Sequence, residues 1–237
     1  MLRTGVIEFP SGSLLLEHRR SPREIADDLP NLPILPETLL AMELQLQESP
    51  VDLRGFSETV IGDLGATIQI LRLAGREYGT DEGRPLRIED CISDLGLRAC
   101  LGAATSGTLV RGVRQRADVE VWTHSREVAK HFRLLAEEMP GSINPDQAYL
   151  AGLLHAIGAL PAILQWQCGD TAGGRTHFAL QLAERWRFPG FVKDFFCELL
   201  IPGYHPHWSR IYATAHLRAE ESWARCPLED APMQPSA

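Results

Sequence analysis

The sequence predicts an all-α fold built as one multi-helix domain, and three features of the chain support this prediction. The stretch Asp146–Leu164 is almost continuously apolar, which is typical of a helix surrounded by other helices. Several other segments repeat apolar residues at helical spacing, between residues that begin or end helices. The length of 237 residues suits one domain of about 150–200 residues with short extensions.

Composition narrows the class of protein. The apolar share of 44% is ordinary for a soluble globular protein, and no run reaches the roughly 18 apolar residues of a membrane span. Because the N-terminus has no convincing signal-peptide core, we expect a cytoplasmic protein. The five cysteines are scattered without a C-x-x-C pair, which favours reduced, buried thiols over a disulfide framework or a zinc knuckle.

Net charge argues against nucleic-acid binding. The chain carries a formal charge of −8 and has a pI near 5.5, so it lacks the basic surface that supplies most nonspecific affinity for nucleic acid. The densest basic stretch, Arg111–Arg116, is short, and we interpret it as a solvated loop. We expect neither a nucleic-acid partner nor a membrane.

The N-terminal part of the chain divides into an extension and two helices. Residues 1–28 are predicted to form an extension, either a short extended strand pair around a Pro-Ser-Gly turn or a segment that packs along the domain. A helix is predicted over Glu37–Gln47, with Pro36 in its first turn and Ser49-Pro50 ending it. Its inward residues are predicted to be Leu39, Met42, Leu46 and Leu40.

The next segments continue the helical pattern. Asp52 is predicted to cap a helix that extends through Ile61, and Asp63 and Asp94 are interpreted as helix-end residues. Gly96 is predicted to interrupt a helix that begins at Ile88. Further helices are predicted over residues 65–74, 119–139, 177–186, 191–200 and 209–223, and close helix packing over residues 97–113.

Around the central apolar stretch, Asn144 and Pro145 are predicted to start the helix, and Gly158 and Pro161 mark a kink or an end. The glycine-rich residues 169–176 lack the spacing and the lysine of a phosphate loop, so we interpret them as a connection. The tail, residues 223–237, is predicted to be disordered.

Within the central helix, the segment GLLHAIGAL resembles the GLLHDIG signature of the HD superfamily of metal-dependent phosphohydrolases. The resemblance implies that His155 occupies the position of a metal-binding histidine and Ala156 that of the adjacent aspartate. The helix VWTHSREVA implies the same for His124, at the first histidine. An alanine has no lone pair with which to bind a cation, so the signature is incomplete.

The order of motifs is more specific. LPxLPE before a helix, IGDLGATIQILRLA, IEDCISDLGL, the W-x-H-S helix and LAERWRFP together resemble the HDOD domain, a non-hydrolytic relative of the HD fold in bacterial signalling proteins. The resemblance covers about residues 29–222. It implies an all-α HDOD bundle without catalytic activity.

A hydrolytic HD site also requires a distal aspartate. The resemblance places it around His216–Ala219, where the chain has none, and Glu220 is one residue out of step. With two of four ligands left, we predict no catalytic residues, no cofactor and no bound metal, and we interpret His124, His155 and Ala156 as vestigial positions. We expect His155 to be a neutral core histidine hydrogen-bonded to His124 or to a backbone carbonyl.

Other candidate sites are weaker. His205 and His207 are predicted to lie in a proline-rich loop, where a metal would need a further ligand. Ser125 and Cys168 have no neighbouring base in sequence. Exposed tryptophans would serve as anchors for a partner; the candidates are Trp122, Trp166, Trp186, Trp208 and Trp223.

The sequence therefore predicts a non-catalytic HDOD signalling or output module that binds a protein partner. One alternative is a metal-dependent HD phosphohydrolase with a diverged ligand set. Another is a nucleotide-binding sensor without hydrolysis, for which His124, Arg126 and Arg175 are the only basic hints. The partner, the signal and the oligomeric state are not fixed by the sequence.

Overall fold

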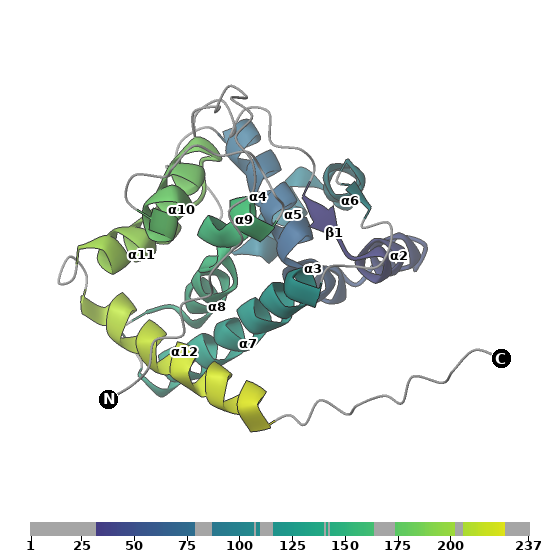
Figure 1. Ribbon diagram of the computed structural model, residues 1–237. Helices are drawn as coiled ribbons and strands as arrows, with labels where there is room; N and C mark the ends of the chain where they lie inside the picture. The colour runs from purple at the N-terminus through teal and green to yellow at the C-terminus, as the bar shows by residue number, and fades with distance from the viewer. Residues whose placement is uncertain are drawn as a thin grey trace, which may run out of the picture.

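In the computed structural model the chain folds into an α-helical bundle, as the sequence predicts (Figure 1). The structure describes residues 32–78, 87–106, 108–109, 116–139, 141, 143–163, 174–201 and 206–225. The predicted N-terminal extension, Trp166, Cys168 and His205 lie outside these residues. Within the described part, no helix is long and apolar enough to cross a membrane.

The first helices begin where the sequence predicts. Strand β1 (Pro33–Ile34) leads into α2 (Pro36–Gln45), which has proline at its first position. Helix α3 (Leu53–Ile61) is capped by Asp52, whose side chain accepts a hydrogen bond from the backbone N–H of Arg54. Helix α4 (Leu64–Tyr78) is longer than predicted at both ends.

One prediction for this part of the chain is wrong in detail. Leu40 was predicted to face inward, but its side chain is 56% exposed, because α2 buries only the face that carries Leu39 and Met42. Within residues 97–113, where close helix packing is predicted, helix α6 (Leu97–Thr105) packs on α4. Strand β2 (Thr108–Leu109) follows the helix and pairs in parallel with β1.

Gly96 separates α5 (Ile88–Leu95) from α6 (Leu97–Thr105), as predicted. Its φ of 85° lies in the left-handed region, where a side chain would add strain. The glycine therefore lets the chain turn between two short helices without a loop.

Helix α7 (Arg116–Glu138) is the longest in the described part of the chain and packs mainly against α8 (Pro145–Leu154) and α12 (Pro206–Arg225) (Figure 1). Helix α8 begins at the predicted start, because the side chain of Asn144 accepts hydrogen bonds from the N–H groups of Asp146 and Gln147. The bundle is thus organised around one central helix.

The predicted helix over residues 146–164 is broken earlier than expected. Helix α8 ends at Leu154, and a 3-10 turn η1 (Ile157–Ala159) and the short helix α9 (Leu160–Ile163) follow it. His155 is the residue that closes α8. It therefore lies at a helix end and not in the middle of a helix.

The last three helices contain two further corrections. Helix α10 (Gly174–Arg185) begins inside the glycine-rich stretch that was interpreted as a connection. After α11 (Gly190–Leu200), helix α12 begins at Pro206, so His207 is helical and does not lie in a loop. Helix α12 also continues to Arg225, three residues into the predicted tail.

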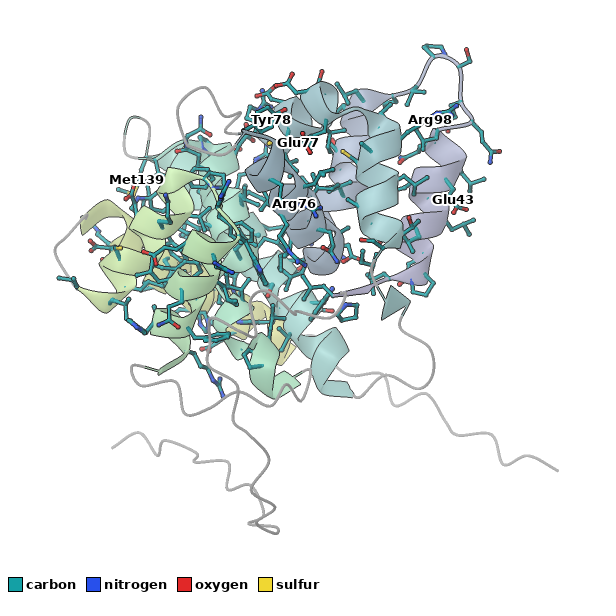
Figure 2. All side chains as sticks on the ribbon, turned by 90° about the horizontal axis from the view of Figure 1, so that it is seen from above. Glu43, Arg76, Glu77, Tyr78, Arg98 and Met139 are labelled. Carbon is teal, nitrogen blue, oxygen red and sulfur yellow. The ribbon has the colours of Figure 1, made fainter. Side chains whose placement is uncertain are left out.

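The core is rich in aromatic residues in the C-terminal half, where Phe132 of α7 meets Phe195 of α11 and Trp208 of α12 at ring-centroid distances of 6.0 and 5.9 Å. Trp122, Trp186 and Trp208 are all buried, so these three cannot serve as exposed anchors for a partner. Figure 2 shows the side chains on the ribbon from above. Glu43 of α2 and Arg98 of α6 lie on one edge, and Met139, just after α7, lies on the opposite side.

Candidate functional site

Three histidines from three helices converge in the C-terminal half of the bundle. His124 comes from α7, His155 from the end of α8 and His216 from α12. One ring nitrogen of each lies within 4.8 Å of the other two. We call these three residues the histidine cluster.

The structure confirms the prediction that His155 hydrogen-bonds to a backbone carbonyl. Its Nδ1 lies 2.7 Å from the backbone oxygen of Gly152, so the ring donates its proton to that carbonyl. His124 stands edge-on to it, with 5.3 Å between ring centroids. Burial lowers the pKa of His155 to about 3, an effect that the carbonyl opposes and that His124 and His216 reinforce. The ring is therefore neutral at physiological pH.

His216 is the member of the cluster that sequence reasoning missed. Its Nε2 lies 3.2 Å from the Nε2 of His124, and its Nδ1 lies 3.2 Å from Oε1 of Glu220 one turn along α12. An HD site has an aspartate near this position, so the histidine was not recognised as a ligand. The sequence signal that could have identified it is the i, i+4 spacing of a histidine and a glutamate on one helix.

Both ring nitrogens of His216 have a neighbour. Its Nδ1 faces the carboxylate of Glu220, and its Nε2 faces Nε2 of His124, so which of these two Nε2 atoms donates depends on the tautomers of the rings. Burial and the neighbouring His216 lower the pKa of His124, although Glu220 opposes this shift. A polar chain thus runs from His124 through His216 to a carboxylate at the surface.

Tyr212 closes the apolar side of the cluster. Its ring lies 5.8 Å from His155 and 5.7 Å from His216, centroid to centroid, and it also contacts Phe132 and Phe195. Burial raises the pKa of its hydroxyl to about 12. The phenol is therefore protonated at neutral pH and acts as a wall of the site.

Ala156 follows His155 directly and presents only a methyl group at the position that the resemblance assigns to an aspartate. Glu220 is a carboxylate beside the cluster, and it faces the outer nitrogen of His216. Among the described residues, the cluster therefore offers imidazole nitrogens and no carboxylate ligand.

The other predicted positions take no part in this site. Arg126 and Arg175 are exposed. Ser125 is buried, and its Oγ has no hydrogen-bond partner among the described residues. Cys91 and Cys100 are buried, and burial raises the pKa of the Cys100 thiol to about 12, which makes it unreactive at neutral pH.

A separate cavity of about 420 Å³ lies between α3, α5, α7 and the first turns of α8, whereas His155 lies at the other end of α8. The three arginines that line this cavity pair with acidic residues: Arg54 with Glu58, Arg87 with Glu89 and Asp146, and Arg133 with Asp146 and Glu137. A nucleotide phosphate would have to compete with these carboxylates, so the cavity does not favour the nucleotide-sensor alternative.

Comparison with known proteins agrees with the fold. In structure, the chain is similar to the MmoQ response regulator from Methylococcus capsulatus strain Bath, at 20% identity over 85% of this chain and 91% of that one, with a TM-score of 0.67. It is also similar to a virulence factor from Campylobacter jejuni, at 16% identity over 86% and 83% of the two chains, with a TM-score of 0.59. At these identities the likeness shows the shared fold. No curated protein matches the chain.

The family model of the HDOD domain matches residues 32–168, more than half of the chain, and this range includes His124, His155 and Ala156. The third histidine, His216, lies beyond the matched range. The chain belongs to the HDOD domain family.

Proposed function

We propose that this HDOD domain is a non-catalytic module of a bacterial signalling system that acts by binding a protein partner. The observation that carries the proposal is the ligand chemistry of the histidine cluster. A phosphohydrolase that uses hard divalent ions needs carboxylate oxygens, and Ala156 leaves only a methyl group where the HD signature has an aspartate.

The signalling part of the proposal rests on family and fold. The chain belongs to the HDOD family, and one protein with the same fold is described as a response regulator. A module of this kind transmits a signal through association, which requires a surface that a partner can recognise.

Exposed apolar side chains on α2 are the best candidate for that surface. Leu40 and Leu44 are 56% and 53% exposed and are four residues apart, so they form one ridge on the outer face of the helix. Apolar ridges of this kind supply the desolvated centre of protein interfaces.

The test of the non-catalytic role is a hydrolysis assay on the purified full chain. The substrates are p-nitrophenyl phosphate, bis-p-nitrophenyl phosphate and a cyclic dinucleotide, each with Mg²⁺, Mn²⁺, Fe²⁺ or Zn²⁺. We expect the same rate as for the His155→Ala variant with every ion. Metal-dependent turnover that disappears in His155→Ala would contradict the proposal and favour the alternative of a metal-dependent phosphohydrolase with a diverged ligand set.

A further inference from the structure

The histidine cluster offers three candidate metal ligands. The sequence motifs contain only two of these histidines, and no metal was predicted from them. The structure adds His216, whose ring nitrogen lies with those of His124 and His155 inside a 4.8 Å group. Three protein ligands with one open position is the composition of many zinc sites.

The rings are oriented as zinc-binding histidines usually are. Such histidines donate their second ring nitrogen to a carbonyl or a carboxylate, which fixes the tautomer and aims the other nitrogen at the ion. His155 donates from Nδ1 to the backbone oxygen of Gly152 at 2.7 Å, and Nδ1 of His216 lies 3.2 Å from Oε1 of Glu220. A proton on Nδ1 of each ring leaves the Nε2 atom with the lone pair that can bind an ion.

The separation of two of the rings already suits coordination. The Nε2 atoms of His124 and His216 are 3.2 Å apart. Two nitrogens bound to a tetrahedral Zn²⁺ at about 2.05 Å are separated by about 3.3 Å. Rotation of the His155 side chain has to bring its nitrogen closer by about an ångström or more to complete the set.

The chemistry of the donors selects the ion. Imidazole suits zinc and other late first-row ions, whereas Mg²⁺ and Ca²⁺ require oxygen ligands. The HD signature supplies carboxylates, so this cluster differs from that site in its ligands and in the ion that it prefers.

We propose that His124, His155 and His216 bind one Zn²⁺ ion through their Nε2 atoms, with water in the fourth position. The ion takes the place of the proton that lies between Nε2 of His124 and Nε2 of His216, and a neutral His124 that binds the ion through Nε2 carries its proton on Nδ1. Because the ligands come from α7, α8 and α12, the bound ion links the C-terminal helix to the part of the chain that matches the family model.

The test is a zinc titration of the full chain, purified without an affinity metal, stripped with EDTA and freed of the chelator. Competition with a chromophoric chelator measures stoichiometry and affinity. We expect one Zn²⁺ per chain and a rise in Tm of several degrees at saturating zinc, with no effect of Mg²⁺ or Ca²⁺. A stoichiometry well below one, or equal responses to zinc and magnesium, would overturn the proposal.

Variants locate the site. His216→Ala and His155→Ala should each weaken zinc binding at least tenfold, and Glu220→Gln should weaken it by about tenfold through loss of the negative charge that faces Nδ1 of His216. His177→Ala is the matched control, because this histidine bonds to Gln181 on α10, outside the cluster. Loss of binding in the control to the same degree as in His216→Ala would contradict the assignment.

A second measurement protects the test against variants that fail to fold. Co²⁺ added to the wild-type chain should give the visible absorption of a tetrahedral ion, and added Zn²⁺ should remove it. Absence of that spectrum would also overturn the proposal. Failure here is distinguishable from failure of the proposed function: absence of zinc binding leaves the non-catalytic role intact, whereas zinc-dependent hydrolysis contradicts that role and supports the metal site.

Discussion

The backbone N–H of Leu35 donates a hydrogen bond of 2.7 Å to Oδ2 of Asp63, a residue 28 positions later in the sequence. The other oxygen of the same carboxylate accepts from the N–H groups of Gly65 and Ala66 at the start of α4. The indole N–H of Trp122 on α7 also points at it, 3.4 Å away. One buried side chain therefore connects the start of α2 with α4 and α7.

Replacement of Asp63 by alanine should be strongly destabilising. Burial raises the pKa of its carboxyl, although hydrogen bonds from Leu35, Ala66, Thr38 and Trp122 oppose this shift. Removal of the side chain leaves several buried donors without an acceptor, each of which costs about 1–3 kcal/mol. We expect the free energy of unfolding in urea to fall by about 3 kcal/mol or more.

Asp52 is the control for that experiment, since it caps α3 in the same way but is exposed. Asp52→Ala should cost about 1 kcal/mol, the usual value of a single exposed cap. Equal losses for the two variants would show that the long-range hydrogen bonds of Asp63 contribute nothing.

Two helical glycines should respond to alanine in opposite directions. A Cβ on Gly152 of α8 would lie 2.8 Å from Cα of Ala129 and 3.2 Å from the ring of Phe132, so α7 and α8 would have to separate. We expect Gly152→Ala to destabilise the chain by about 1–3 kcal/mol. A Cβ on Gly102 of α6 meets nothing within 4 Å, and Gly102→Ala should stabilise by about 0.5–1 kcal/mol. Urea unfolding of both variants checks the pair, and a stabilised Gly152→Ala would contradict the close packing.

The helices were predictable because their signals are local. Two helix caps, Asp52 and Asn144, and the helix interruption at Gly96 each depend on residues within one turn of the chain. Their roles could therefore be predicted from neighbouring residues in the sequence. The HDOD resemblance also depended on motifs that are short and contiguous. These features are confirmed by the structure and by the family match.

The early end of α8 and the cluster itself were not predictable in this way. An apolar run does not reveal that the backbone of Arg175 approaches Gly158 so closely that a Cβ there would lie 2.0 Å from its oxygen. His124 and His216 are 92 residues apart, and their contact depends on how α12 packs on α7. The pairing of β1 with β2 is non-local in the same sense.

The metal-free protein should lose stability in mild acid because of His155. Its folded pKa of about 3 lies below the ordinary value of 6.5, so the unfolded chain binds the proton more tightly. The contribution is therefore fully present above pH 6.5 and is lost as the pH falls from 6.5 toward 3. The titratable groups that face the ring are His124 on α7 and His216 and Tyr212 on α12.

The measurement is the free energy of unfolding in urea between pH 7 and pH 4, with EDTA present. We expect the wild-type value to fall more steeply than that of His155→Leu, with a difference approaching about 1.4 kcal/mol per pH unit, which corresponds to one proton. Carboxylates titrate in both proteins, so the comparison isolates the histidine. Parallel curves would show that His155 is protonated as easily in the folded chain as in the unfolded one.

The surface proposed for the partner gives a last prediction. The double variant Leu40→Asp/Leu44→Asp places two charges on the exposed ridge of α2 and removes its apolar area. We expect it to fold with nearly unchanged stability, because both side chains are more than half exposed, and to lose affinity for the partner by at least a hundredfold. Leu217→Asp is the control, since Leu217 is 60% exposed on α12, which packs on α7 and α11, whereas α2 packs on α3 and α6. Partners identified by cross-linking to the wild-type chain would be titrated against all three proteins. Equal binding by the double variant and the wild type would exclude the α2 ridge as the interface. Loss of affinity in Leu217→Asp alone would instead place the interface on α12.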